Sequence, residues 1–299
     1  MENKHITVML EDAIEALDIQ TNCWYVDCTF GRGGHTEKIL QAGGKVIAFD
    51  FDQEAIDYGT EKFASDIQKG NLFLIRENFA SLAEIVSNLQ KNNQIGEIHG
   101  VLLDFGTSTQ QLTSQERGFS FEGDGPLDMR MDQRLGVQAK DLLAIIPENQ
   151  LTELFRDFGG EIDAKRIVKA IKASRTPITQ TNQLADLIVT VKGRQKGKLH
   201  PATKVFQALR IAVNTELDNI TSLLPQALNI LSDGGKIVTI AFHEGEDKIV
   251  KHTFRAWETE NLGFTAKKPA TPSEEEVSTN TRSRSAKMRV FHKGTHEQQ

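Results

Sequence analysis

The sequence predicts an α/β fold in which a parallel, doubly wound sheet is interrupted by a helical insertion between its fourth and fifth strands. Short apolar runs alternate with helical patterns through the first hundred residues, an order typical of parallel strands in one sheet. Residues 137–195 then contain only helical patterns, and a strand pattern resumes at 236–242. The helical insertion therefore lies within one sheet domain.

The expected strands are apolar runs at 24–28, 45–50, 72–76, 100–104, 236–242 and 286–292. The expected helices of the sheet lie at 35–42, 53–67 and 79–92, and those of the insertion at 137–146, 149–158, 161–173 and 181–191. A helix over 202–231 should lead back to the sheet, with a kink or division at Pro225, because proline lacks a backbone donor. We therefore expect a sheet domain of residues 1–110 and 200–299 and an inserted domain of residues 111–199.

A glycine-rich turn joins the first strand to the first helix. The segment 27–35 reads Asp-Cys-Thr-Phe-Gly-Arg-Gly-Gly-His. Its glycines allow backbone amides to approach a ligand, and the N-terminus of the following helix favours negative charge. The turn predicts a nucleotide-cofactor site, although a tight glycine turn without that function has the same pattern.

Three carboxylates stand at the ends of expected strands. Asp27 ends the first strand, Asp50 the second and Asp104 the fourth. In open α/β sheets the ligand crevice lies at the carboxyl ends of the strands, so we expect all three to face one site. Each one taken alone is also explained as a helix cap or a loop residue.

The turn also limits the choice of cofactor. A dinucleotide fingerprint has a third Gly or Ala three residues after its second glycine, and Thr36 stands there instead, which disfavours NAD. A ligand with one ribose and no phosphate, such as S-adenosylmethionine, needs only the close turn, an acid for its ribose and an apolar slot for its adenine. No metal site is expected, because the spacing of Cys23 and Cys28 matches no common metal motif.

Composition indicates a globular chain with unevenly placed charge. The 299 residues carry a net charge of −6 and are 38% hydrophobic. Without an apolar signal core or a membrane-length apolar run, the chain is expected to be cytoplasmic and to have no membrane partner. Residues 161–204 hold ten Lys or Arg against three acids, and residues 282–299 hold five against one. Such regions are typical of nucleic-acid contacts, and a solvated helix face explains the first equally well.

A long polar loop over 113–132 precedes the helical insertion. It places Phe119 and Phe121 between polar residues and carries arginines and aspartates suited to a charge network. Ordered loops of this length are usually functional, and aromatic and arginine side chains suit the stacking of an unpaired base. A structural loop anchored by the two phenylalanines is the alternative.

Eight distinct sequence blocks, spread over almost the whole chain, carry a resemblance to a known family. They lie at 5–10, 27–35, 116–121, 124–132, 200–203, 206–211, 214–217 and 282–286. The run Asp-Gly-Pro-Leu-Asp-Met-Arg-Met-Asp at 124–132 is highly specific. Together the blocks resemble the bacterial small-subunit ribosomal RNA (cytosine-N4) methyltransferase H family. The resemblance implies a class I methyltransferase sheet of the Rossmann-like kind, with an inserted all-helical domain for substrate recognition. It also implies S-adenosylmethionine as donor and a cytosine in the decoding region of 16S ribosomal RNA, in the small subunit, as acceptor.

The resemblance assigns cofactor contacts residue by residue. They fall on Gly33, Gly34, His35, Asp50, Phe79, Asp104 and Gln111. The chain departs from the family pattern close by, where Thr109 and Gln110 replace Ser-Pro and Ala241 replaces serine. These departures concern the shape of the loop and fine substrate contacts more than cofactor binding.

Catalysis should be limited by the weakly nucleophilic cytosine amine. An acceptor on its N–H would draw the nitrogen lone pair out of conjugation and receive the lost proton, and Asp104 or a carbonyl beside Gly106 is the first candidate, with His243 the second. Asp104 could instead serve only the cofactor. Rival functions are an NAD-dependent dehydrogenase, a non-catalytic ribosome-binding module and a methyltransferase for DNA, nucleotides or protein. The sequence leaves open whether the chain is a monomer or a homodimer.

Overall fold

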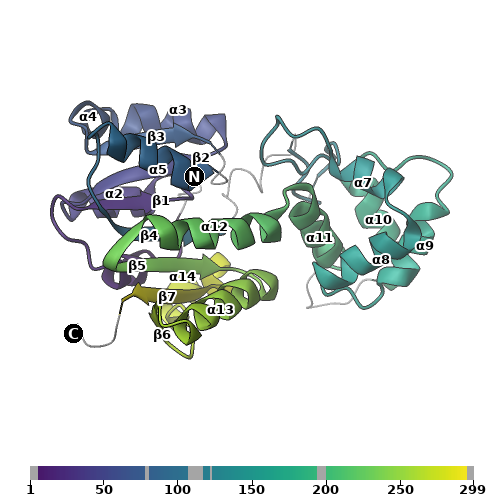
Figure 1. Ribbon diagram of the computed structural model, residues 1–299. Helices are drawn as coiled ribbons and strands as arrows, with labels where there is room; N and C mark the ends of the chain where they lie inside the picture. The colour runs from purple at the N-terminus through teal and green to yellow at the C-terminus, as the bar shows by residue number, and fades with distance from the viewer. Residues whose placement is uncertain (1–5, 78–80, 107–116, 122, 194–199, 295–299) are drawn as a thin grey trace. The chain divides into compact units, whose positions relative to one another are not determined.

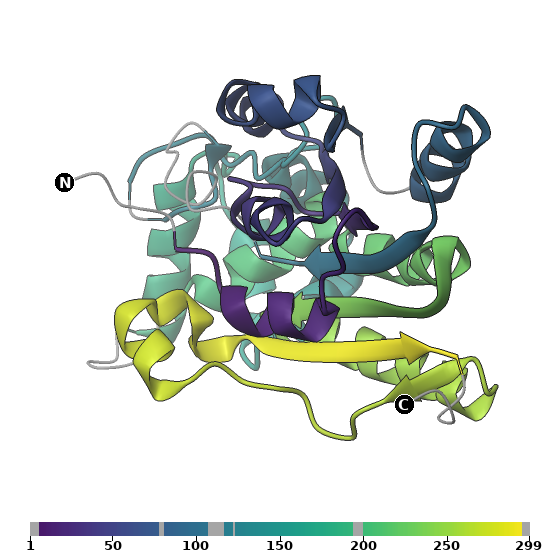
Figure 2. The same ribbon diagram turned by 90° about the vertical axis from the view of Figure 1, so that its left-hand side faces the viewer.

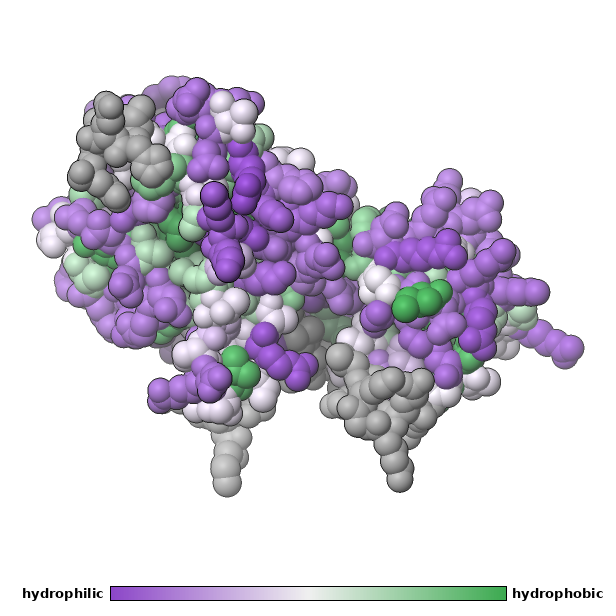
Figure 3. All heavy atoms as spheres, turned by 90° about the horizontal axis from the view of Figure 1, so that it is seen from below, coloured by the Kyte–Doolittle hydropathy of each residue, from purple (hydrophilic) through white to green (hydrophobic). Residues whose placement is uncertain are grey.

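The computed structural model describes residues 6–77, 81–106, 117–121, 123–193 and 200–294. The chain divides into two compact units, which we call the sheet unit (Met1–Gly106 with Leu217–Gln299) and the helical unit (Thr107–Glu216). No helix among the described residues is long and apolar enough to cross a membrane. On the face drawn in Figure 3, hydrophobic residues form small separate groups on a mostly hydrophilic surface.

The sheet unit contains a seven-stranded sheet in the order β3-β2-β1-β4-β5-β7-β6 (Figure 1). Its strands are β1 (Trp24–Asp27), β2 (Lys45–Asp50), β3 (Leu72–Arg76), β4 (Ile98–Asp104), β5 (Leu231–Ala241), β6 (Gly263–Thr265) and β7 (Lys287–Lys293). The first five strands pair in parallel. The prediction of an α/β sheet with a helical insertion between its fourth and fifth strands is confirmed.

The far edge of the sheet contains a reversed strand. Strand β7 runs antiparallel to β5 and also antiparallel to β6. The short strand β6 takes the edge position, and β7 lies between it and β5. The sheet is therefore mixed, with five strands that pair in parallel and one reversed strand, β7.

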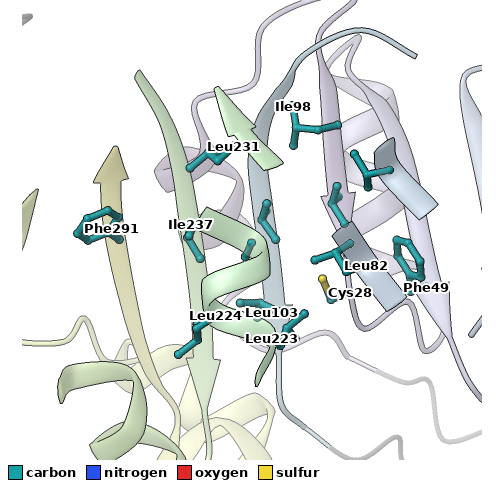
Figure 4. Close-up of a cluster of buried hydrophobic side chains, with 14 of the residues drawn as sticks. Cys28, Phe49, Leu82, Ile98, Leu103, Leu223, Leu224, Leu231, Ile237 and Phe291 are labelled. Atoms are coloured by element: carbon teal, nitrogen blue, oxygen red, sulfur yellow. The ribbon is translucent and has the colours of Figure 1, made fainter. Parts of the chain in front are cut away.

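One face of the sheet packs against α5 (Leu82–Lys91), α12 (Glu216–Ile230) and α13 (Glu244–Thr259). Figure 4 shows part of this core, where Leu103 and Ile237 from the strands approach Leu223 and Leu224 of α12. Because the central strands are buried on both faces, they read as continuous apolar runs instead of alternating ones. From β4, the residues Ile98, Val101 and Leu103 belong to this core.

The opposite face packs against α1 (Leu10–Leu17) and α2 (Gly34–Gln41). The helix α1 lies along β4 and β5 in Figure 2. Leu102 and Ile240 belong to the core on this side, whereas Leu103 belongs to the core on the other. Because successive side chains of a strand point to opposite faces of the sheet, Leu102 and Ile240 lie on the face that packs against α2. The helices α3 (Gln53–Lys62) and α4 (Ala64–Gln68) follow β2 and divide the expected helix 53–67 at Phe63.

The helical unit is built from five described helices around its own core. They are α7 (Ala139–Ile145), α8 (Glu148–Asp157), α9 (Ala164–Lys172), α10 (Thr181–Lys192) and α11 (Thr203–Val213). In the basic helix α9, Ile167 and Ile171 are buried while Lys165 and Lys169 are exposed, as its amphipathic pattern predicts.

The expected helix 202–231 is two helices, and the break is not at the predicted place. Pro225 lies inside α12, whereas Thr215 between α11 and α12 has a left-handed backbone with φ of 48°. The Asn214 side chain stabilises the break, because its amide accepts from Met131 N at 2.7 Å and donates to the Met129 carbonyl at 2.8 Å. The helix α11 packs with α7 and α8, so the structural division follows Glu216 and not residue 199.

The packing of Gly33 gives a test of the fold. A Cβ at this position would lie 2.7 Å from the rings of Phe30 and Phe63, and its φ is 70°. Gly70 has a similar φ of 72° with nothing within 4 Å, so it is a matched control. Gly70→Ala should cost roughly 1 to 2 kcal/mol from backbone strain. Gly33→Ala should cost about 1 to 3 kcal/mol more from overpacking. Urea unfolding would show this difference, and equal midpoints for the two variants would contradict it.

Candidate active site

The turn after β1 is held between its two neighbouring strands. Phe30 N donates to the Phe49 carbonyl at 2.9 Å, which ties the turn to the end of β2. On the other side, Asp104 N donates to the Thr29 hydroxyl at 2.8 Å, which ties the turn to the end of β4. The carboxyl ends of β1, β2 and β4 are therefore fixed together as one edge of the sheet.

The side-chain directions of Gly33 and Gly34 are filled by protein atoms. A Cβ on Gly33 would meet the Phe30–Phe63 pair, and one on Gly34 would meet the side chain of Thr7. Both glycines are thus required by the packing of the turn itself. Only the backbone of these residues is left for the predicted cofactor contacts.

Asp27 does not face the site with the other two strand-end carboxylates, so this expectation was wrong. Its side chain is fully buried, and it accepts from the Thr36 hydroxyl at 2.7 Å and from Thr29 N at 3.0 Å. Burial raises the pKa of Asp27, and the hydrogen bonds from Thr36 and Thr29 oppose this rise. The carboxylate serves to join the turn to the start of α2.

Asp50 lies at the end of β2 and is anchored by two backbone amides. One oxygen accepts from Gly31 N at 2.8 Å and the other from Asp52 N at 2.8 Å. A carboxylate has about four acceptor positions, so each oxygen can accept a further hydrogen bond from a ligand. Burial raises the pKa of Asp50 to about 6, despite these two hydrogen bonds.

Asp104 lies at the end of β4 beside the first turn of α2. Its Oδ1 accepts from Gly106 N at 3.1 Å, and its Oδ2 is 4.0 Å from His35 Nδ1. Burial, with smaller contributions from the charges of Asp27 and Glu246, raises the pKa of Asp104 to about 7, although the hydrogen bond from Gly106 N and the charge of Arg282 lower it. The group can therefore hold or release a proton near neutral pH.

His243 lies two residues after the end of β5 and is the N-cap of α13. Its Nδ1 accepts from Glu246 N at 3.4 Å, and its Nε2 lies 3.0 Å from Glu246 Oε1. The same buried carboxylate accepts from Phe242 N at 2.7 Å through Oε2. Both ring nitrogens of His243 thus face Glu246, which gives the imidazole a defined role in capping α13.

In the helical unit, the described part of the polar loop is packed and cross-linked. Arg130 forms the expected charge pair with Asp128, with Nε to Oδ1 at 2.7 Å and Nη2 to Oδ2 at 2.8 Å. Arg117 donates to the Met131 carbonyl at 2.7 Å. Phe119 is buried in the core of the unit. These contacts favour the structural interpretation of this part of the loop.

Comparison with known proteins identifies the family. The family model described as the MraW methylase family matches residues 2–294. The chain belongs to this family. It is 41% identical over 296 residues to the ribosomal RNA small subunit methyltransferase H of Coprothermobacter proteolyticus, covering 97% of this chain and 96% of that protein.

The chain is also 42% identical over 317 residues to the protein of the same name from Alteromonas mediterranea, covering 98% of each. Among solved structures, an rRNA methylase from Streptococcus thermophilus aligns over 97% of this chain and 98% of that chain, at 10% identity and a TM-score of 0.47. This structural likeness is too weak to support an argument about function.

The structure of this family member brings five of the predicted site residues to one edge of the sheet. Gly33, Gly34 and His35 begin α2, Asp50 ends β2, and Asp104 ends β4 within 4.0 Å of His35. Phe79 and Gln111 lie outside the described residues, as do Thr109 and Gln110. Their predicted roles stay predictions.

Sequence reasoning missed two residues that shape the site. The Thr29 hydroxyl accepts a hydrogen bond from Asp104 N and so links the turn to β4. The Glu246 carboxylate accepts from Phe242 N and so holds the backbone that follows β5. The spacing of His243 and Glu246 is that of a capping box, in which the residue three positions after the N-cap reaches back to its amide. This spacing could have revealed Glu246, whereas nothing local to Thr29 indicates its partner on β4.

The raised pKa of Asp104 predicts a pH dependence of stability. Between about pH 4 and 7 the folded state holds a proton on Asp104 that the unfolded state has released, because the folded pKa is about 7. The contribution of this group to the free energy of unfolding is therefore lost as pH rises through that window. Asp104→Asn stays neutral, so its stability should fall less between pH 5 and 8.

Urea unfolding at a series of pH values would measure the effect, with Glu61→Gln, which alters an exposed acid on α3, as control. Parallel stability curves for wild type and Asp104→Asn would contradict the expectation.

Proposed function

We propose that this chain transfers a methyl group from S-adenosylmethionine to the exocyclic N4 amine of a cytosine in the decoding region of 16S ribosomal RNA. The match to the MraW methylase family over residues 2–294 carries the proposal. The relatives named ribosomal RNA small subunit methyltransferase H support the choice of acceptor, because they match nearly the full chain. The small ribosomal subunit is the proposed partner and the cytoplasm the proposed location.

The residues at the strand ends suit this cofactor. Asp50 is held by two backbone amides and keeps acceptor positions for ribose hydroxyls. Asp27, Asp50 and Asp104 concentrate negative charge, and each has a raised pKa because burial disfavours its ionised form. A ligand with a sulfonium and an ammonium group would offset that charge. We propose Gly33, Gly34, His35, Phe79 and Gln111 as the remaining cofactor contacts.

Methyl transfer requires that the donor and the acceptor amine be aligned and that one group accept the proton that the amine loses. S-adenosylmethionine, when bound, supplies a methyl group on a positively charged sulfur. Asp104 would accept a hydrogen bond from the N4 amine and take the proton that nitrogen loses as it bonds to the methyl carbon. Asp104 is our first candidate for this role, because Nδ1 of His243 accepts from Glu246 N in capping α13. We propose that His243 supports the site by fixing the start of α13.

The proposed function has a direct test. The chain is incubated with labelled S-adenosylmethionine and small ribosomal subunits that lack the modification, and the RNA is digested to nucleosides. We expect label in N4-methylated cytidine. Large subunits provide a control acceptor. Labelled nucleosides other than methylated cytidine, or no label in the small subunit, would overturn the proposal.

The role of Asp104 is tested separately. Asp104→Asn should retain affinity for S-adenosylmethionine within a few-fold and lose about 100-fold or more in methyl transfer, as expected for removal of a general base. Wild-type kcat/KM should rise with pH, reach half of its maximum near pH 7 and level off above about pH 8, because the ionised carboxylate is the active form and its pKa is about 7. Lost cofactor affinity with normal transfer at saturation would instead make Asp104 a cofactor ligand only.

A further inference from the structure

The acceptor base needs a surface beside Asp104, and the described loop aromatics are already engaged within the helical unit. Phe119 is buried. The ring of Phe121 stacks on His200 with centroids 4.4 Å apart and meets Phe206 edge-on at 5.3 Å. Both rings are therefore used in packing. The expectation that one of them holds the base lacks support from their surroundings.

The sheet unit offers another aromatic ring on the face that carries Asp104. In the parallel pairing of β4 and β5, Asp104 lies opposite Ile240. Side chains alternate between the faces of a strand, so Phe242, two residues after Ile240, continues on that face. Its ring packs partly buried against the core that contains Leu102 and Ile240. Phe242 and Asp104 thus project from neighbouring strand ends toward the same side of the sheet.

Gly106 shows how close the ring and the carboxylate lie. A Cβ on Gly106 would be 2.9 and 3.1 Å from two atoms of the Phe242 ring and 3.1 Å from Asp104 Oδ1. Both side chains therefore lie beside the same Cα atom. A side chain at position 106 would separate them or push one aside, so the glycine allows their approach.

The position of Phe242 is fixed by its backbone. Its N–H donates to Glu246 Oε2 at 2.7 Å, and Glu246 is 1% exposed. The same carboxylate accepts from His243 N at 3.2 Å. The start of α13 thus holds the backbone that carries the ring, and a buried charge-assisted hydrogen bond of this kind makes a stable anchor.

We propose that the Phe242 ring is the surface on which the acceptor cytosine packs, with the amine directed to Asp104. The exocyclic amine lies in the plane of the base. A base resting on a ring next to the carboxylate can therefore present its N–H edge to Oδ1. Every base has a π-face, and stacking on an aromatic side chain suits a base that has left its helix. This inference rests on the proposed function and adds a specificity-determining residue to that site.

Three variants of Phe242 test whether the aromatic ring itself is needed or only an apolar side chain of similar volume. Phe242→Leu keeps much of the volume without a ring, Phe242→Ala removes both, and Phe242→Tyr keeps the ring. Loss of stacking should lower kcat/KM for small ribosomal subunits by about 5- to 150-fold in the Leu and Ala variants. The Tyr variant should stay near wild type. The affinity for S-adenosylmethionine, measured by titration calorimetry, should change less than about twofold in all three.

Phe264→Leu is the matched control. This phenylalanine lies on the edge strand β6, where its ring stacks on His292 at 4.6 Å, and it is remote in the strand order from β4. Its variant should methylate subunits at the wild-type rate.

Two results would overturn the inference. A Leu variant equal to wild type would show that the ring face has no role, and a parallel loss of cofactor affinity would assign the ring to the cofactor. Failure of the proposed function is distinguishable, because the wild-type chain would then methylate no cytosine in the subunit while still binding S-adenosylmethionine.

Discussion

The hydrogen bond from Asp104 N to the Thr29 hydroxyl joins the two strand ends on which the candidate site depends. Parallel pairing places the ends of β1, β2 and β4 at one edge, but it does not fix the turn that follows β1. Thr29 fixes that turn to β4, and Phe30 fixes it to β2 through the Phe49 carbonyl. A buried amide left without its acceptor costs about 1 to 3 kcal/mol, so the turn and the carboxylate are energetically linked.

Local sequence predicted the strands, the turn and the carboxylates well because each has a short-range signal. Continuous apolar runs mark buried parallel strands, and Asp50 and Asp104 directly follow such runs. The fate of Asp27 could not be predicted, since a buried carboxylate depends on partners such as Thr36 from the next helix. The antiparallel direction of β7 is a property of its pairing with β5 and β6, which no pattern within 286–292 shows. The helix break at Thr215 depends on Asn214 bonding to the distant Met129, which no pattern within 202–231 shows.

The three carboxylates at this edge of the sheet differ in their hydrogen bonds and in their pKa values. Asp27 is committed to the turn by its hydrogen bonds, and Asp50 is oriented by two amides while keeping free acceptor positions. Asp104 accepts one backbone hydrogen bond, and its pKa of about 7 lies above the value of about 6 for Asp50. Glu246 combines both roles, because its buried carboxylate anchors the start of α13 and adds negative charge near Asp104. The three strand-end acids are therefore chemically distinct despite their similar places in the sequence.

The N-terminal segment contacts residues 276–280 near the glycine turn. Met9 N donates to the Glu276 carboxylate in α14 (Glu274–Thr279) at 2.7 Å, and Asn280 donates to the Ile6 carbonyl at 3.1 Å. The neighbouring Thr7 packs against Gly34 at the start of α2. During synthesis, the contiguous helical unit can complete its contacts before the last 80 or so residues emerge from the ribosome. The N-terminal segment beside the turn must wait for residues 276–280, so this part of the candidate site is completed only at the end of translation.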